Sequence, residues 1–475
     1  MARTRLSALD GSFLRVETPT AHMHVGWKGI FDPRAGGGTA SVEQLRRSIA
    51  GRLRHAPRFR QRLAFTPGGF AEPVWVDDER FDVAEHVIAL AEPGQRLSRA
   101  RFDELCDQVL SQPLDRGRAL WSLHVAPQLQ DGSLGLVMKA HHAMVDGRSA
   151  VELALLLLDL TPDPPEAEAD DWAARPAPSS VRLALDAMVD TGGESLRTAA
   201  GLARAVASPR LAGTLRRTAL AVGEDLLRAA PSSYVNAPLS ARRALVHHTH
   251  AIDPLLEAKA KLGVTLNDLA LTIVAGALRE HAIRAGQRPQ PLKAMVPVST
   301  REPAEAADLG NRIAFVFVDL PVGMGSTADR LDAVRAATAR FKAQDRAAGG
   351  AAILGSLGAL PGPVKDRAAR IAAAPRMYNL TVSNVPGPRM AVWLRGCALR
   401  EAVPVIPLAD EHALSVGIFS YADRITFGAY ADPDALPQAR DLPVALCAAA
   451  LDVCGLAAPP GRRRRPLKAV AASGP

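Results

Sequence analysis

Strand-like and helix-like segments alternate in the first 160 residues, and this mixture limits the fold more than any other feature. Residues 120–125 and 134–140 have strand-like composition and flank Asp131-Gly132, a turn sequence that predicts a hairpin. Residues 149–160, SAVELALLLLDL, predict a buried helix directly after it. The first part of the chain therefore combines a sheet with helices.

The same mixture returns after residue 240. Residues 265–283 predict a helix opened by Thr265 and Asn267, and Asp423-Arg424 predicts a turn between the last two strands. The predicted strands are residues 293–300, 312–320, 378–385, 413–420 and 425–431. Strands mixed with helices in both halves predict an α/β (α+β) fold made of two sandwich domains with mixed sheets.

A change of composition separates the two halves. Residues 161–180, TPDPPEAEADDWAARPAPSS, are rich in Pro, Asp, Glu and Ala, which is typical of a linker. Apolar residues at helical spacing continue from residue 181 to residue 230, and this segment is also rich in arginine. The pattern fits either helices packed on the protein or a helix on a membrane surface. The predicted units are residues 1–160 (first domain), 161–238 (linker and connecting helices), 239–458 (second domain) and 459–475 (a basic, disordered tail with Arg462 to Arg465).

Charge and composition narrow the possible partners. The 475 residues carry a net charge of +8, which favours anionic partners, and aromatic residues make up only 4%. Without basic and aromatic residues interleaved, we expect no nucleic-acid partner. The four cysteines form no CxxC pair, the first residues contain no apolar secretion signal, and the longest apolar runs are too short to cross a bilayer. We therefore expect a cytoplasmic protein.

The strongest chemical signal is HHAMVDG, residues 141–147, between a predicted strand and a predicted helix. Two His, an Asp and a Gly at these spacings should arise by chance in roughly one such chain in a thousand. Neighbouring strand residues point to opposite sides, so only one histidine can face a given cavity. Asp146, with Gly147 permitting a tight loop, can turn back to orient a ring or pair with an arginine.

Three chemistries compete for this motif. A zinc site needs a third ligand, and Ala143 follows the second histidine where a ligand motif would continue. The GxSxG sequence of an activated serine and the Walker A loop are both absent. A neutral imidazole that removes a proton from an alcohol is the simplest catalytic interpretation, and a hydrogen-bonded core histidine pair is the structural alternative. We expect no metal, and the same holds for the pairs His22/His24 and His248/His250.

At this point the sequence resembles a known family. HHAMVDG matches the HHxxxDG motif of CoA-dependent acyltransferases with the chloramphenicol-acetyltransferase-like fold. Further blocks resemble the bacterial wax ester synthase/acyl-CoA:diacylglycerol acyltransferase family: residues 6–26, 113–121 (PLDRGRALW, with Ala119 where proline is usual), 266–268 (LND), VPVSTR, GNRIAFVFVDLP and NLTVSNVPGP. The resemblance extends from about residue 6 to 455.

The resemblance implies an active-site tunnel between two such domains. His142 would be the general base, with His141, Asp146 and Gly147 supporting the site geometry. Asn267 and Asp268 would help to shape the site from the second domain.

Arg116 and Arg118 would serve structure beside the substrate, with Asp115 or Asp146 as their partners. Long-chain acyl-CoA would be the co-substrate, with no permanently bound cofactor. Diacylglycerol or a fatty alcohol would be the acceptor, and the enzyme would work at a membrane or lipid-droplet surface. The alternatives are a same-fold acyltransferase for another alcohol or amine, and an inactive lipid-binding relative.

Overall fold

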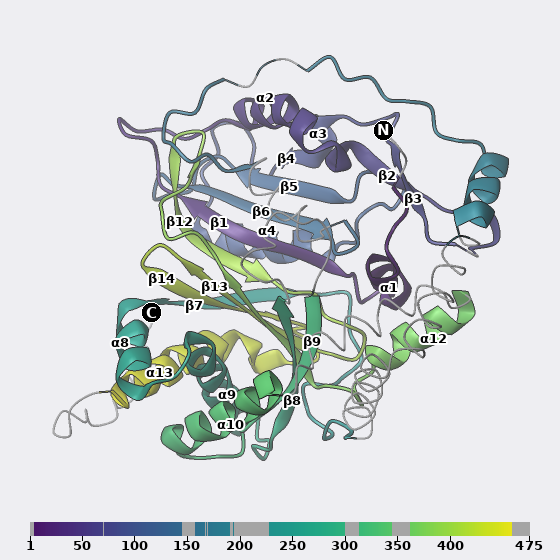
Figure 1. The fold of residues 1–475 in the computed structure, drawn as a ribbon. Coiled ribbons are helices and arrows are strands. Elements are labelled where there is room, and N and C mark those ends of the chain that lie inside the picture. Colours follow the sequence, from purple (N-terminus) through teal and green to yellow (C-terminus); the bar gives the residue numbers. More distant parts are fainter. Residues whose placement is uncertain are drawn as a thin grey trace.

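The chain folds into two stacked sheets with helices around them. The computed structural model describes residues 4–69, 71–144, 157–166, 168, 170–190, 193, 228–299, 313–343 and 362–457. Within them lie two six-stranded sheets and a small two-stranded sheet. Figure 1 shows helices on the outer faces of both large sheets, with the sheets facing each other across the middle of the molecule. The predicted mixed α/β architecture is confirmed.

The first sheet has the strand order β11-β12-β1-β6-β5-β4 and contains one parallel pair, β4 with β5. The predicted hairpin is its β5–β6 pair, which runs antiparallel from the Asp131-Gly132 turn. Gly132 there has a φ of +84°, a conformation that favours glycine. The strands are β1 (His24–Phe31), β4 (Val87–Ala89), β5 (Trp121–Ala126), β6 (Leu134–His141), β11 (Trp393–Leu394) and β12 (Cys397–Val405).

The second sheet has the order β7-β14-β13-β10-β8-β9, with β8, β10 and β13 parallel. All five strands predicted after residue 240 are present. The turn between the last two lies at Ala422-Asp423, one residue earlier than predicted, and Ala422 takes a φ of 49° there. The strands are β7 (Ala244–Ala251), β8 (Leu292–Ser299), β9 (Ile313–Leu320), β10 (Leu380–Pro386), β13 (Leu414–Tyr421) and β14 (Arg424–Ala431).

Helices cover these sheets. In Figure 1 α2 and α3 lie on the outer face of the first sheet, and α8, α9, α10 and α13 cover the second. The α-helices are α1 (Ala8–Val16), α2 (Val42–Arg52), α3 (Val83–His86), α4 (Arg99–Ser111), α8 (Asp253–Leu262), α9 (Leu266–Arg284), α10 (Thr327–Ala343), α12 (Gly362–Ala372) and α13 (Leu442–Gly455); residues 180–190 are also helical. The remaining elements are the 3₁₀ turns η1 (Leu53–His55), η2 (Pro57–Arg60), η3 (Pro67–Gly69) and η6 (Pro437–Asp441) and the small sheet of β2 (Gln61–Ala64) and β3 (Val74–Asp77).

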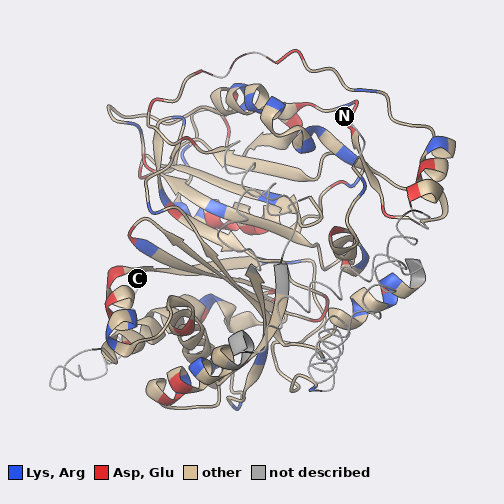
Figure 2. Ribbon diagram, viewed as in Figure 1, with Lys and Arg blue, Asp and Glu red and all other residues tan. Residues whose placement is uncertain are grey.

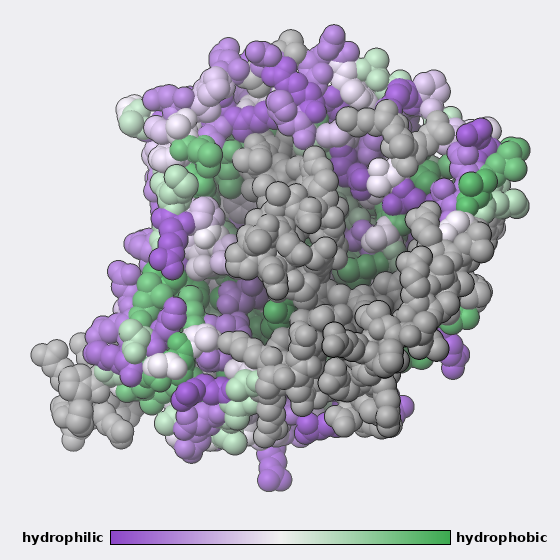
Figure 3. Space-filling model, in the orientation of Figure 1, coloured by the Kyte–Doolittle hydropathy of each residue, from purple (hydrophilic) through white to green (hydrophobic). Residues whose placement is uncertain are grey.

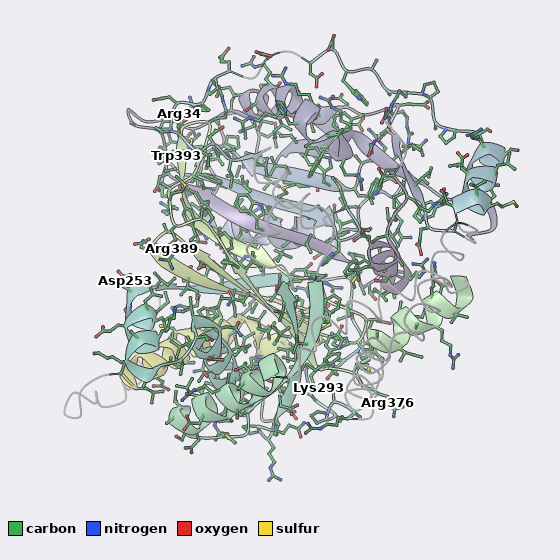
Figure 4. The ribbon with its side chains drawn as sticks, viewed as in Figure 1. Arg34, Asp253, Lys293, Arg376, Arg389 and Trp393 are labelled. Atoms are coloured by element: carbon green, nitrogen blue, oxygen red, sulfur yellow. The ribbon has the colours of Figure 1, made fainter. Side chains whose placement is uncertain are left out.

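One pairing corrects the predicted domain boundaries. Residues 239–458 were predicted to form the second domain, yet β11 and β12 belong to the first sheet, where β12 pairs with β1. Asp159 bridges Trp393 of β11, and Arg34 donates a 2.8 Å hydrogen bond to the carbonyl of Arg395 at the same sheet edge (Figure 4). The sheets are therefore not divided along the chain as predicted, because a strand pattern does not say which sheet a strand joins.

Two glycines allow β12 to lie across the second sheet. A Cβ at Gly417 of β13 would come within 2.8 Å of the Pro404 side chain, and one at Gly428 of β14 within 2.6 Å of the Pro404 carbonyl oxygen. Neither distance is possible for a real side chain, so both positions require glycine. This close approach brings β12 of the first sheet against β13 and β14 of the second sheet.

Several predictions fall outside the described residues. These are most of the predicted helix at 149–160, most of residues 191–230 and the tail at 459–475. The described residues between 161 and 179 form neither helix nor strand. Among the described helices none is alone long and apolar enough to cross a bilayer; only α8 and α9, bent by 109° at their junction, reach that length and hydropathy together.

Candidate active site

A cavity of about 590 Å³ lies between the two sheets. Its wall is predominantly apolar and takes side chains from both sheets, including Met138 of β6, Pro404 of β12 and Met295 of β8. Helices α1 and α12 supply a further wall. A mostly apolar cavity of this size with a few polar groups is typical of a small-molecule site.

His142 lies on this cavity wall, directly after β6. Its backbone N–H donates a 2.8 Å hydrogen bond to the carbonyl of Met23, and its ring stacks on Phe13 with 3.8 Å between ring centroids. The Nδ1 atom is buried and has no hydrogen-bond partner among the described residues. Burial lowers the pKa of His142 to about 4. The imidazole is therefore neutral at physiological pH and carries a free lone pair.

His141 points the other way, as the alternation of strand side chains predicts. It is 1% exposed, and its Nδ1 accepts a 3.0 Å hydrogen bond from the Ala143 N–H. The proton consequently sits on Nε2, which donates to Oε2 of Glu17 at 3.2 Å. The two histidines thus have different surroundings, and only His142 lines the cavity.

Glu17 is a site residue that the sequence analysis missed. Its carboxylate lies between His141 and Arg116 and accepts a hydrogen bond from each. Burial disfavours the charge of Glu17, but the hydrogen bonds from His141 and Arg116 and the positive charge of Arg116 outweigh burial and hold the pKa of Glu17 below the usual value. Glu17 is the residue that ends α1, and a negative charge there opposes the helix dipole. This unfavourable position was the one sign in the sequence that Glu17 has a positively charged or hydrogen-bonding partner.

The two predicted arginines have partners other than those expected. Arg116 pairs with Glu17 rather than with Asp115, whose carboxylate accepts the Gly117 N–H at 2.8 Å. Arg118 binds Asp78 at 3.1 Å and also pairs with Glu85. Partners so far apart in the sequence cannot be found from local spacing. Arg116 thus supports the histidines through Glu17, while Arg118 stabilises the neighbourhood of β3 and α3.

Asn267 and Asp268 lie at the start of α9, on the side of the second sheet away from the cavity. Asp268 and Thr265 form a reciprocal capping box that opens α9, so Thr265 is the cap, as predicted. The Asn267 side-chain oxygen accepts a 3.2 Å hydrogen bond from Asn384 of β10. The neighbour of Asn384 on that strand, Ser383, lines the cavity. The contact of Asn267 with the cavity is therefore indirect, through β10.

The remaining candidate site residues are the rest of the motif and the two other histidine pairs. Asp146 and Gly147 lie outside the described residues. Both ring nitrogens of His24 are buried and have no hydrogen-bond partner in the part of the chain that the structure describes. His250 faces the Cys454 thiol with 3.8 Å between Nε2 and Sγ. Within the described ranges no three His, Cys, Asp or Glu side chains are placed to hold a metal ion.

Neutral buried histidines predict acid sensitivity. Burial lowers the pKa of His24 well below its usual value, and burial lowers the pKa of His124 and of His142 to about 4. Unfolded histidine titrates near 6.5, so the unfolded chain binds more protons below that pH. The stability these residues contribute is complete above pH 6.5 and falls as the pH drops towards 4.

We expect the free energy of unfolding, measured in urea, to decrease by a few kcal/mol between pH 7 and pH 5, since each pH unit per proton is worth about 1.4 kcal/mol. Because His124 lies away from the cavity wall, His124→Gln should make this slope shallower. An unfolding free energy that stays constant over the same range would contradict the assignment.

The fold has known counterparts. The first condensation domain of the calcium-dependent antibiotic synthetase, in complex with a substrate analogue, matches with a TM-score of 0.58 at 17% identity, covering 96% of this chain and 97% of that one. A wax ester synthase/diacylglycerol acyltransferase from Marinobacter aquaeolei VT8 matches with a TM-score of 0.68 at 24% identity over 96% and 99% of the chains. The fold is thus that of the condensation and acyl-transfer proteins built from two such sheets.

Sequence relatives narrow this class. A probable diacylglycerol O-acyltransferase of Mycobacterium tuberculosis H37Rv is 32% identical over 450 residues, which cover 92% of this chain and 93% of the relative. A second one from the same strain is 31% identical over 430 residues, covering 88% and 92%. The model of the wax ester synthase/diacylglycerol acyltransferase catalytic domain matches residues 6–270, and the model of its C-terminal domain matches residues 309–449. The chain belongs to the wax ester synthase/diacylglycerol acyltransferase family and is an acyltransferase.

Proposed function

We propose that this acyltransferase moves a long-chain acyl group from acyl-CoA to the hydroxyl of diacylglycerol or of a fatty alcohol, with His142 as the general base. The product is a triacylglycerol or a wax ester. The observation that carries the proposal is the neutral imidazole on the wall of an apolar cavity between the sheets. The names of the relatives and of the family supply the substrate class.

The proposed reaction needs no covalent enzyme intermediate. The unprotonated nitrogen of His142 accepts the proton of the acceptor hydroxyl while that oxygen attacks the thioester carbonyl carbon. A C–O bond forms and gives a tetrahedral oxyanion, whose negative charge stabilises the imidazolium beside it. The C–S bond then breaks, and the imidazolium returns the proton so that CoA leaves as a thiol. A positioned base of this kind contributes about 10²–10⁴-fold to the rate.

The cavity and the charge suit these substrates. Each methylene of an acyl chain buried against an apolar wall contributes about 0.8 kcal/mol, so long chains are favoured. The whole chain carries a net charge of +8, which suits the anionic CoA.

Thiol release from palmitoyl-CoA tests the proposal. The purified protein is incubated with palmitoyl-CoA and either dioleoylglycerol or hexadecanol, and free thiol is followed over time. We expect release that depends on the acceptor. No release above background with either acceptor would favour a lipid-binding protein without activity. Release with only a short polar alcohol or an amine would favour the same-fold alternative.

We also propose that the enzyme works on the cytoplasmic side at a membrane or lipid-droplet surface, docking through the helix of residues 180–190. Four large apolar side chains of this helix are 54–75% exposed, on Val181, Leu185, Met188 and Val189. Figure 3 shows apolar atoms along its outer edge, and Figure 2 shows charges of both signs on it.

Its position suits a lipid substrate. Arg5 binds Asp190 of this helix at 2.9 Å and also donates to the Glu72 carbonyl. Lys365 of the cavity wall lies 3.4 Å from the Glu72 carboxylate. This helix is therefore linked through Arg5 and Glu72 to Lys365 on the cavity wall.

Co-sedimentation with phosphatidylglycerol-containing vesicles tests this docking face. The change Leu185→Asp combined with Met188→Asp should reduce the bound fraction severalfold, because charge at these positions opposes burial among acyl chains. Leu451→Asp, at an exposed position on α13, is the matched control and should leave binding unchanged. Equal binding by all three proteins would count against this face.

A further inference from the structure

Helix α1 contacts both histidines of the motif with residues one turn apart. Phe13 and Glu17 are four positions apart, which places them on the same face of a helix. Phe13 stacks on His142 and Glu17 accepts a hydrogen bond from His141. Neighbouring strand residues point to opposite sides, yet this one helix end contacts both rings.

We propose that Phe13 is a positioning residue for acyl transfer: its ring fixes the orientation of the His142 imidazole on the cavity wall. The inference rests on the proposed role of His142 as the base and goes beyond it, because it assigns the control of that base to α1. Glu17, one turn further along α1, holds the neighbouring His141 through a hydrogen bond.

Apart from Phe13, few described contacts hold the His142 ring in place. The backbone of His142 is tied to Met23, but its Nδ1 has no hydrogen-bond partner among the described residues. The last torsion of a histidine side chain has broad wells, so an imidazole without a hydrogen bond can rotate. The Phe13 ring, 3.8 Å away between centroids and inclined by only 16°, covers one face of the imidazole and restricts this rotation.

Phe13 itself is held firmly because α1 is anchored on several sides. Arg15 binds the Glu72 carboxylate at 2.5 Å and Asp366 of α12 at 2.8 Å. Ser7 caps the start of the helix, and Arg116 donates a 3.3 Å hydrogen bond to the Leu14 carbonyl near its end. A helix fixed at both ends and in the middle transmits its position to the ring of Phe13.

The same contact keeps water from the base. Phe13 also lines the cavity, so it lies where solvent would otherwise reach the imidazole face. Burial is the largest cause of the lowered His142 pKa, with a smaller contribution from His141. The other titratable or charged groups on the elements around it include Asp10, Arg15 and Glu17 on α1, His22 just before β1, His24 and Lys28 on β1, Lys139 on β6, and Arg116.

The test compares Phe13→Ala, Phe13→Leu and Phe13→Tyr with the wild type, with thiol release as the assay. Phe13→Ala should lower kcat about 10–100-fold while the KM for palmitoyl-CoA changes less than about threefold, since orientation of a catalytic group affects the transition state. Phe13→Tyr keeps an aromatic face and should restore most of kcat. Phe13→Leu still shields the His142 imidazole from water but cannot stack on it. This variant should therefore keep the pH profile of the wild type at a reduced kcat.

The pH profile separates positioning from general damage. In the wild type, kcat/KM should be nearly equal at pH 6 and pH 8. In Phe13→Ala, water reaches the imidazole of His142 and the pKa of His142 returns towards 6.5. The value of kcat/KM should therefore be about fourfold lower at pH 6 than at pH 8. Leu9→Ala, another cavity-lining change on α1, should raise KM but leave the ratio between the two pH values near one.

Two results would be decisive against the inference or its basis. If His142→Ala is inactive while Phe13→Ala and Phe13→Leu both keep the kcat and the pH ratio of the wild type, the positioning role of Phe13 is overturned and the base is not. If His142→Ala itself keeps full activity, the proposed function fails, whatever Phe13 does. Melting temperatures show which variants fold, and Phe13→Leu and Phe13→Tyr carry the test if Phe13→Ala does not.

Discussion

Replacement of His142 by alanine is expected to lower kcat by about 10²–10⁴-fold without a large change in melting temperature. Among the described residues, the ring has no hydrogen-bond partner for Nδ1 and stacks on Phe13 alone, so its loss should remove the base and little else. The measurement is steady-state thiol release with palmitoyl-CoA and dioleoylglycerol, together with a thermal unfolding curve.

His141→Ala is the matched control in the same motif. It should cost about 1–3 kcal/mol of stability, because the Ala143 N–H and the Glu17 carboxylate lose a buried partner. His142→Ala should therefore lose turnover, whereas His141→Ala should lose stability. Retained turnover in His142→Ala, or the same outcome for both histidines, would refute their assigned roles.

Replacement of Asp432 by alanine should have the largest effect on stability, about 3–5 kcal/mol. Its carboxylate is 0% exposed, lies 3.4 Å from the guanidinium of Arg243, and accepts hydrogen bonds from Ser240. Without it, the buried Arg243 charge has no carboxylate partner among the residues that the structure describes. Arg243 also donates to the Thr20 carbonyl, in the loop between Glu17 and Met23, so activity should fall with stability.

The chain offers a control two residues away. Asp434 pairs with Arg242 at 2.8 Å, but both side chains are exposed, by 44% and 68%. Asp434→Ala should therefore change the unfolding free energy by no more than about 1 kcal/mol. Urea denaturation of both variants measures the contrast, and equal losses would show that the Asp432–Arg243 pair is not the buried link described here.

Local pattern was sufficient for elements whose burial follows a simple period. The hairpin of β5 and β6 and the strands β8, β9, β10, β13 and β14 have alternating or continuous apolar residues bounded by turn residues. Helix α9 was found from its apolar spacing and from Thr265, which is indeed its cap. In the same way, alternation at the end of β6 predicts that only one of His141 and His142 faces the cavity.

Seven of the described strands were not predicted. Four of them, β2, β3, β4 and β11, have only two to four residues. The three longer ones, β1, β7 and β12, were missed for physical reasons that the structure makes plain. β7 contains His247, His248 and His250, and its polar side chains hide the strand pattern. β12 carries Glu401 in its centre, whose charge is satisfied by Arg99 at 2.6 Å and His247 at 2.9 Å on other elements. β1 was not recognised in the histidine- and glycine-containing segment that follows α1. Their pairing across distant parts of the chain decides which sheet they join.

In the site too, local sequence identified some residues, and contacts between distant parts of the chain determined the others. The histidines were found because they are adjacent in the sequence, whereas Glu17 and Phe13 reach them from more than 120 positions away. An acid at the end of a helix signals the need for a partner but does not identify it. Likewise, the partners of Arg116 and Arg118 became clear only once the chain was folded.

Thiol release during the first turnover tests the central claim most directly. Enzyme is mixed rapidly with excess palmitoyl-CoA, with and without dioleoylglycerol, and free CoA thiol and ester product are quantified in quenched samples. Direct transfer by His142 predicts no thiol above background without the acceptor, and equal rates of thiol and ester formation with it. A burst of one thiol per enzyme molecule in the absence of acceptor would contradict the account, because it requires a covalent acyl-enzyme.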